Sequence, residues 1–326
     1  MKKKQKQTSK FKRFCKWFFV VVIALMLLGF IYEQTCELID SKTLKAPGQM
    51  VQVGDHKMHI YCTGENINGS PTVILEAGGG GNYTNWHRVQ PEVSKYTKVC
   101  SYDRSGMGFS EPTQDKRSNS EVVAELENLL KAANINGPYI MVGHSMGGFY
   151  TRLFTKRNLD QVKGLIQVDP STEEMANLSE VNVPLGIRIQ SSLIEFAFHI
   201  GVARIAQHIY PPIGMIDKDI ANIQIAFNST AIESRNKYED GYGFLDNIQE
   251  IRDASAFGNL PVIVFSADKS EELAVINYGE ECRTWHINLA KRLSNNSQHI
   301  MVKNSNHYIQ FDQPQVVIDV IKGMLK

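Results

Sequence analysis

Hydrophobic and polar positions divide the start of the chain into two contrasting segments. The first 16 residues carry eight lysines and arginines and no acid, and the run Trp17–Tyr32 that follows is uncharged. This run is slightly shorter than the roughly 20 apolar residues of a typical spanning helix. Trp17 and Tyr32 end it with aromatic rings, which favour the membrane–water interface. The pattern predicts a basic tail over 1–16 and a transmembrane anchor over 17–32 whose partner is the lipid bilayer.

The charge of this flank also predicts the orientation of the anchor. Positive residues beside a span favour the cytoplasmic side, so we expect the N-terminus in the cytoplasm and the rest of the chain outside the cell membrane. A cleaved signal peptide, which would give a secreted protein, is the alternative, but no small-x-small cleavage site follows the run. Residues 33–49 are mixed and polar and end in Pro47-Gly48, so they are expected to form a tether.

Beyond the tether, short β-rich runs alternate with helical patterns. The expected strands are Met50–Val53, His59–Cys62, Thr72–Glu76, Lys98–Tyr102, Tyr139–Val142, Gly164–Val168, Val262–Phe265 and His299–Val302. Apolar residues at helical spacing mark Glu121–Ala133, Leu289–Leu293 and Val316–Leu325. This alternation predicts a mostly parallel, eight-stranded sheet with helices on both faces. The short turn at Gly54-Asp55 predicts an antiparallel hairpin at one edge.

One long interval interrupts this alternation. Between Asp169 and Pro261 no good strand is found, but apolar residues recur at helical spacing from Leu193 to Ile209 and over Ile220–Phe227. We therefore expect a helical insertion at about 171–258 within a single domain over 50–326.

Composition narrows the function. The chain is 43% hydrophobic and 21% charged, which is typical of a globular protein, and its net charge of +1 gives no case for a nucleic-acid partner. Its five cysteines form no CxxC pair and no cluster with histidine, so neither a zinc site nor a disulfide scaffold is supported. Cys62 and Cys100 fall on expected strands. We expect buried free thiols there, with a disulfide between Cys62 and Cys100 as the alternative.

The stretch GHSMGG, residues 143–148, joins an expected strand to an expected helix. The pattern G-x-S-x-G in this context is typical of a nucleophile elbow, in which Gly143 and Gly147 leave room for a tight turn and Ser145 is lifted out of the sheet. The alternative is an ordinary corner in which Ser145 only caps the helix. A serine nucleophile also needs a base, so the rest of the chain decides between the two.

A base and an acid are available at the expected strand ends. His307 follows the last strand, in a loop beyond its carboxyl end, where α/β sheets place functional groups. Asp268 follows the strand over Val262–Phe265, and it is the preferred acid for orienting His307. Asp169, at the end of the strand over Gly164–Val168, is the alternative; it could instead cap the turn through Pro170-Ser171.

A third requirement is a pair of N–H donors for an oxyanion. Met146, directly after Ser145, supplies one. The strand over Thr72–Glu76 runs into four glycines, Gly78 to Gly81, whose N–H groups are unobstructed by side chains. We expect Gly79 to be the second donor and Gly80 the alternative. The loop lacks the GK[ST] and dinucleotide spacings of phosphate sites.

These motifs together resemble the α/β-hydrolase superfamily, in its esterase-like branch. The resemblance rests on residues 47–65, 72–86, 99–112, 143–148, 261–268 and 304–314. It implies the α/β-hydrolase fold, with the insertion as a cap that covers the pocket, and a structural role for Arg104 in the wall of the site. The family's usual His-Gly before the oxyanion residue is Ala77-Gly78 here.

The expected function is that of a membrane-anchored serine hydrolase that cleaves a carboxylic ester, with an apolar or lipid-like acyl group, and needs no cofactor or metal. Ser145 is the nucleophile and His307 the base. An acyltransferase, an amidase or a cofactor-free haloperoxidase could use the same groups. A non-catalytic, membrane-tethered binding protein is the alternative from another class.

Overall fold

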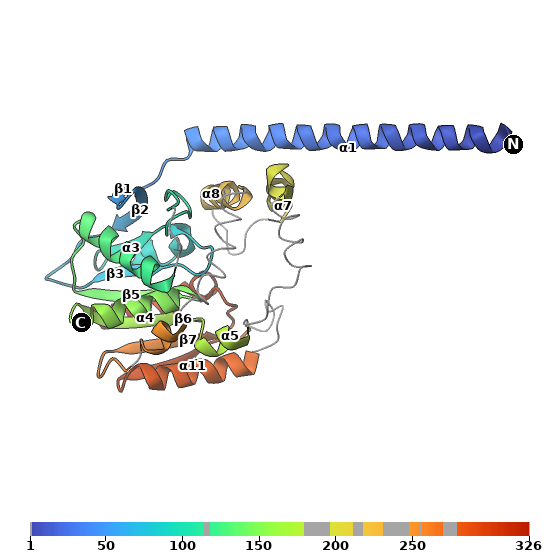
Figure 1. Ribbon diagram of the computed structural model, residues 1–326. Helices are drawn as coiled ribbons and strands as arrows, with labels where there is room; N and C mark the ends of the chain where they lie inside the picture. Colours follow the sequence, from blue (N-terminus) through green and yellow to red (C-terminus); the bar gives the residue numbers. More distant parts are fainter. Residues whose placement is uncertain are drawn as a thin grey trace. The chain divides into compact units, whose positions relative to one another are not determined.

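The computed structural model describes residues 2–113, 118–178, 196–210, 218–230, 248–254, 256–269 and 279–325. Two compact units are formed (Figure 1). One joins residues 1–45 to 183–234, and the other comprises 46–182 and 235–326. The expected apolar positions Leu193 and Ile194 lie outside the described residues.

The second unit is built on a sheet of eight strands in the order β1-β2-β4-β3-β5-β6-β7-β8. The strands are β1 (Gln49–Val53), β2 (His56–Thr63), β3 (Thr72–Glu76), β4 (Val99–Tyr102), β5 (Tyr139–His144), β6 (Val162–Val168), β7 (Val262–Ala267) and β8 (Ser297–Val302). β1 pairs antiparallel with β2, and β2 with β4, whereas the remaining pairs are parallel. The predicted eight-stranded, mostly parallel sheet with an antiparallel hairpin at one edge is confirmed.

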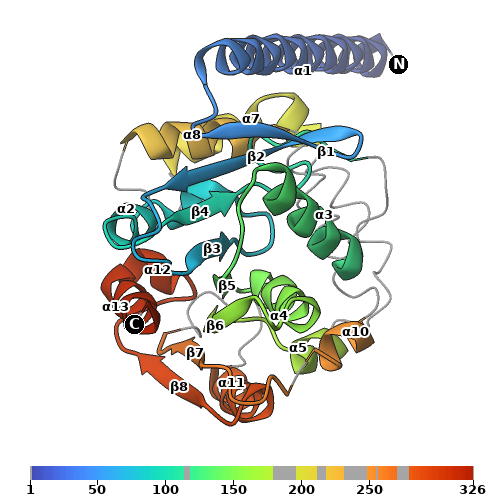
Figure 2. The same ribbon diagram turned by 90° about the vertical axis from the view of Figure 1, so that its left-hand side faces the viewer.

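Helices cover both faces of this sheet (Figure 2). One apolar cluster packs α3 (Asn119–Ala132), α4 (Gly147–Arg157), α10 (Ile248–Arg252) and α11 (Gly279–Leu293) on one face. A second cluster packs η1 (Tyr83–Trp86), α2 (Gln90–Val93), α12 (Ile309–Asp312) and α13 (Pro314–Met324) on the other. The short helix α5 (Glu173–Leu178) follows β6. Because the central strands are apolar on both sides, each face needs such a cover.

The carboxyl ends of β3, β5, β6 and β7 lie at one edge of the parallel region, because these strands all run in the same direction. The loops that follow these strands carry the glycines, the serine and the two aspartates of the predicted site. The fold therefore brings the predicted groups to a single edge of the sheet.

The first unit contains the N-terminal helix α1 (Lys2–Thr43), together with α7 (Val202–Ile209) and α8 (Lys218–Ser229). Within α1, Lys10–Thr43 is long and apolar enough to cross a membrane, and it is a candidate transmembrane span. The helix continues to Thr43, so the first part of the segment 33–49, expected as a tether, is helical. Residues 33–46 contain no glycine or proline, and Pro47-Gly48 is the first helix-breaking pair.

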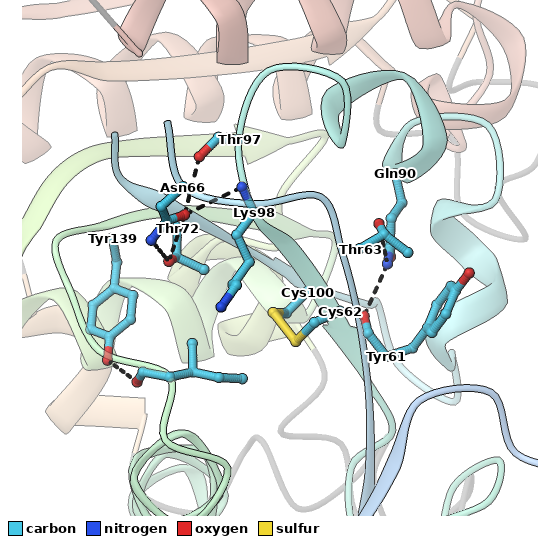
Figure 3. The surroundings of a disulfide bond; sticks show 11 residues. Tyr61, Cys62, Thr63, Asn66, Thr72, Gln90, Thr97, Lys98, Cys100 and Tyr139 are labelled. Atoms are coloured by element: carbon cyan, nitrogen blue, oxygen red, sulfur yellow. Dashed lines mark hydrogen bonds between the residues drawn. A yellow bond between two sulfur atoms is a disulfide. The ribbon is translucent and has the colours of Figure 1, made fainter. Parts of the chain in front are cut away.

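Cys62 and Cys100 form a disulfide, so the expectation of free thiols at these positions is wrong (Figure 3). The two residues lie directly opposite each other on β2 and β4. Side chains opposite each other on antiparallel strands are close enough to join. Cys15, Cys36 and Cys282 are free. The bond fastens the antiparallel edge of the sheet to its parallel centre across 38 residues of sequence.

Candidate active site

The turn at GHSMGG has the geometry of a strained elbow between β5 and α4. Ser145 adopts φ = 51°, in the left-handed region that non-glycine residues rarely occupy. A Cβ at Gly143 would lie 2.4 Å from the Thr151 hydroxyl, and one at Gly147 would lie 2.5 Å from the Ala77 carbonyl oxygen. The turn therefore excludes side chains at both glycines, as the sequence predicted.

Backbone hydrogen bonds tie this elbow to the neighbouring strand end. The Ser145 N–H donates to the Val168 carbonyl at 3.1 Å, and the Ser171 N–H donates to the Ser145 carbonyl at 3.0 Å. A strained conformation persists only where its surroundings determine it. These two bonds supply that constraint, and they hold Ser145 beside the end of β6.

The glycine loop after β3 passes next to the elbow. A Cβ at Gly78 would lie 3.1 Å from the Ser145 Cβ, and one at Gly79 would lie 2.8 Å from the Met146 sulfur. Among the described residues, the N–H groups of Gly79 and Met146 have no hydrogen-bond partner. Gly80, the alternative donor, adopts φ = 62°. The two preferred donors thus come from adjoining segments, and their role as an oxyanion site stays a prediction.

Arg104 braces this loop from behind. Its guanidinium pairs with the Glu76 carboxylate at 2.5 Å and donates to the carbonyl oxygens of Ala77, at 2.8 Å, and Gly78, at 2.7 Å. Arg104 and Glu76 are both buried. With the Ala77 and Gly78 carbonyls held by Arg104, the peptide groups of the loop have a fixed orientation, which agrees with a structural role for Arg104.

His307 contacts Asp169 rather than Asp268. The Nδ1 atom of His307 lies 2.7 Å from Asp169 Oδ2, and the other carboxylate oxygen accepts the Ala267 N–H at 3.0 Å. Because the carboxylate accepts the Nδ1 proton, Nε2 of His307 is left to take a proton from a substrate or nucleophile. Among the described residues no hydrogen bond joins the Ser145 hydroxyl to His307, a contact that is often long in unliganded sites.

The prediction that Asp268 orients His307 is therefore wrong. The Asp268 carboxylate instead accepts the N–H groups of Asn304, at 2.9 Å, and Ser305, at 3.0 Å. These bonds, Asn304 first, lower the pKa of Asp268. Asp268 thus caps the turn that leads into the His307 loop, whereas Asp169, at φ = 43°, turns its own carboxylate toward the imidazole.

A chain of buried groups lies behind Asp169. The His286 Nε2 atom lies 2.7 Å from the Pro170 carbonyl, which can only accept, so Nε2 carries the proton. Burial lowers the pKa of His286, so the ring is neutral and its Nδ1 accepts from the Ser266 hydroxyl at 2.7 Å. Ser266 in turn lies 2.8 Å from His299 Nε2. This chain fixes the backbone next to the acid, and no sequence pattern singled it out.

The electrostatics of the acid follow from the same contacts. Burial of the carboxyl group raises its pKa. The hydrogen bond to His307 and the charge of His307, together with the Ala267 N–H, outweigh burial and leave the pKa of Asp169 below its ordinary value. Asp169 is therefore ionised at neutral pH, the state that an imidazolium partner requires.

His144, inside the elbow motif, connects the elbow to the His307 loop. Its Nε2 donates to the His307 carbonyl at 2.9 Å, and its ring lies 4.6 Å from the His307 ring, centre to centre. Burial, and then the charge of His307, lower the pKa of His144 to about 3. His144 lies within the G-x-S-x-G pattern, but the pattern assigns no role to the residue at this position, so the sequence analysis missed its contacts.

We predict that His144 makes the fold sensitive to acid. The unfolded chain binds a proton near pH 6.5, whereas the folded imidazole stays neutral down to about pH 3. Stability is thus lost as the pH falls through this window. Chemical unfolding of the full chain measures the free energy of unfolding at pH 7 and at pH 5. Between these two values, the decrease in this free energy should be about 2 kcal/mol smaller in His144→Gln than in the wild type. Gln can still donate to the His307 carbonyl. An unchanged difference would exclude His144 as the acid-sensitive group.

No metal ligand set accompanies these groups in the part of the chain that the structure describes, where no cluster of three His, Cys, Asp or Glu side chains is suited to an ion. The chemistry available from the described side chains is that of a hydroxyl, an imidazole and a carboxylate at one edge of the sheet.

The comparisons with known proteins concern the family and the fold. The family model for the alpha/beta hydrolase fold matches residues 71–314. An uncharacterized protein of Bacillus subtilis, YqjL, is 27% identical over 248 residues, which cover 76% of this chain and 80% of that protein. The crystal structure of the carboxylesterase CesB from the same species has a TM-score of 0.61 at 15% identity, covering 91% of this chain and 98% of that one. The chain belongs to the alpha/beta hydrolase family.

A relative of a different kind is an uncharacterized vacuolar membrane protein of Saccharomyces cerevisiae, 27% identical over 189 residues. These cover 51% of this chain but only 29% of the yeast protein. The match therefore concerns one part of a longer protein.

Proposed function

We propose that this α/β hydrolase is a serine hydrolase that cleaves carboxylic esters, with Ser145 as nucleophile, His307 as base and Asp169 as the orienting acid. The observation that carries the proposal is the contact of 2.7 Å between His307 Nδ1 and Asp169 at the strand end beside the Ser145 elbow. A serine at a strained elbow with an imidazole and a carboxylate at the same edge is the arrangement that acyl transfer needs.

The reaction would proceed in two halves. The Ser145 oxygen attacks the ester carbonyl carbon while His307 Nε2 takes the hydroxyl proton, and the negative oxygen that forms accepts the N–H groups of Gly79 and Met146. The C–O bond then breaks, and His307 returns the proton to the departing alcohol. Water attacks the acyl-serine with His307 again as base, which releases the carboxylic acid and restores Ser145.

Two alternatives to ester hydrolysis keep the same groups and change only what receives the acyl group or which bond is cleaved. An acyltransferase would hand the acyl-serine to an alcohol or amine in place of water, and an amidase would expel an amine. No observation on the described residues favours either over ester hydrolysis. A non-catalytic binding protein would have no need for the strained Ser145 or for the ionised Asp169.

A panel of soluble nitrophenyl esters of increasing acyl length tests the proposal. The purified full chain in detergent should hydrolyse at least one of them, and a fluorophosphonate probe should label the protein at one serine within the peptide that contains 143–148. A protein that neither hydrolyses any ester nor takes up the probe would contradict the proposal. Labelling with release of product only when an alcohol is added would favour the acyltransferase.

We further propose that α1 anchors the protein in a membrane with the hydrolase domain outside the cytoplasm. The basic flank before Trp17 supports this orientation. The disulfide between Cys62 and Cys100 supports it independently, because such bonds persist in oxidising compartments and are rare in the cytosol.

The orientation of the anchor and the disulfide between Cys62 and Cys100 can be tested in one bacterial expression experiment. Protease added to intact spheroplasts should remove the domain beyond residue 50, and non-reducing digestion of the membrane fraction should give the linked Cys62 and Cys100 peptides. A domain that is digested only after lysis would place it in the cytoplasm. A soluble product that begins shortly after the apolar run would favour the cleaved signal peptide.

A further inference from the structure

The first unit carries a buried ion cluster that joins the helix α7 to the N-terminal helix. Arg204 of α7 makes a bidentate pair with Glu33 of α1, at 2.7 Å and 3.0 Å, and a second pair with Asp40 at 2.7 Å. Glu33 is 1% exposed and Arg204 4% exposed. Among residues 10–43 of α1, whose side chains are mostly solvent-accessible, Glu33 is the buried position.

Burial alone would disfavour the charged guanidinium. Hydrogen bonds and charge from Glu33, and then from Asp40, outweigh burial and raise the pKa of Arg204 above its ordinary value. The guanidinium is therefore charged, and leaving it unpaired in this buried position would be costly. This makes the cluster a firm attachment between α7 and α1.

Close backbone contacts accompany the ion pairs one turn earlier on α1. A Cβ at Gly29 would lie 2.4 Å from the Ile200 carbonyl oxygen, and one at Gly201 would lie 2.8 Å from the Tyr32 ring. The segment that leads into α7 thus packs directly on the last turn of the apolar run Trp17–Tyr32, and Figure 1 shows α7 beside α1.

This attachment fixes the depth of α7 along the anchor. With about 1.5 Å of rise per residue, Glu33 lies about 25 Å from Lys16, the last residue of the basic flank. The hydrocarbon core of a bilayer is about 30 Å thick. If Lys16 lies at the inner surface, the segment around Ile200 and Arg204 lies at the outer edge of the hydrocarbon, where apolar and polar groups meet.

The side chains that α7 presents to solvent match such a position. Val202, Ile205 and Ile209 recur at helical spacing on one side of α7 and are 49%, 49% and 64% exposed. Tyr210 at the end of the helix is 77% exposed. Arg204 and Gln207 lie on other sides and bond to α1 and to α8. An apolar face of this kind on a short amphipathic helix is typical of interfacial binding.

We propose that α7 is a membrane-interface helix, which the Arg204 cluster holds against the outer leaflet so that Val202, Ile205 and Ile209 contact lipid. The proposal rests on the proposed anchor. Its consequence for the proposed esterase is a specificity for esters that reside in the bilayer, because part of the insertion is immersed where such substrates are found.

Fluorescence quenching tests the contact without using activity. The full chain, with Cys15, Cys36 and Cys282 replaced by serine, carries an environment-sensitive dye on Ile209→Cys and is reconstituted in phosphatidylcholine and phosphatidylglycerol vesicles. Lipids with a quencher near the headgroup should lower the emission about twofold relative to unlabelled lipids. Emission unaffected by the quencher would overturn the proposal. Energy transfer between dyes on neighbouring protein molecules that depends only on protein density would also overturn it, in favour of contact between two copies.

A pair of arginine variants tests the attachment. Arg204→Gln should abolish most of the quenching, because the cluster that holds α7 to α1 is broken, whereas Arg157→Gln, which removes an ion pair on the surface of the other unit, should leave quenching unchanged. Equal quenching in both variants would contradict the role of Arg204. Near-UV circular dichroism and hydrolysis of a soluble short ester verify that each variant is folded.

The readouts separate this inference from the proposals on which it rests. Flotation of the protein with the vesicles reports the anchor, and turnover of the soluble ester reports the serine hydrolase. Ile205→Glu with Ile209→Glu should slow hydrolysis of a long-chain ester in vesicles about tenfold and change turnover of the soluble ester less than about twofold. An equal effect on both substrates would contradict a membrane role for α7, even in an active, anchored enzyme.

Discussion

Ser145→Ala is expected to lower kcat for ester hydrolysis on the order of 10⁶-fold and to abolish fluorophosphonate labelling. The reason is that no other hydroxyl occupies the elbow, and the base and the N–H donors have nothing to act on without a nucleophile. Substrate binding should change little, because the substitution removes one oxygen. Initial rates on a soluble ester, with active-site labelling followed by peptide mass spectrometry, provide the measurement.

Ser171→Ala is the matched control. Ser171 lies at the same edge of the sheet, and its N–H donates to the Ser145 carbonyl, but that bond uses the backbone and survives the substitution. Its activity should stay within a few fold of the wild type. Labelling that persists in Ser145→Ala, or that disappears in Ser171→Ala as well, would move the nucleophile away from position 145.

The architecture of the sheet was predictable because each strand is a short apolar run between glycines, prolines or polar turns. Thr72–Glu76 was predicted to the residue. The elbow was predictable for a similar reason: steric exclusion at Gly143 and Gly147 is a local property of the chain. Features of this kind need no knowledge of which distant segments meet.

Other features depend on which distant segments meet, and they escaped prediction. The disulfide requires the pairing of β2 with β4, and β3 intervenes between them in the sequence. Without that pairing, two cysteines on two apolar strands look like buried thiols. His286 on α11 is likewise placed by packing, and its contact with the Pro170 carbonyl spans 116 residues.

The choice of acid belongs to the same class. β6 and β7 are neighbours that run parallel, so Asp169 and Asp268 emerge at the same edge of the sheet. Sequence places both within reach of the His307 loop. In the structure, Asp169 has a left-handed backbone and contacts His307, whereas the Asp268 carboxylate accepts the N–H groups of Asn304 and Ser305. Neither property is visible in the residue types alone.

Asp169→Asn is expected to lower kcat on the order of 10⁴-fold, and Asp268→Asn far less. At position 169 the amide can place an N–H against His307 Nδ1, which would force the proton onto Nε2 and leave His307 unable to accept one from Ser145. At position 268 the amide oxygen can still accept an N–H from the turn, so the His307 loop should loosen without losing its acid. Initial rates on a soluble ester measure both effects, with circular dichroism to show that both variants are folded.

The pH dependence distinguishes loss of the acid from loss of structure. If Asp169 sets the tautomer of His307, Asp169→Asn should regain activity as the pH rises, since hydroxide can partly replace the base, whereas a misfolded variant would not. Asp268→Asn should keep the pH profile of the wild type and lose stability instead. A large, pH-dependent loss in Asp268→Asn beside a nearly active Asp169→Asn would return the orienting role to Asp268. The bond between His307 and Asp169 would then be a feature of the resting enzyme that is exchanged when substrate binds.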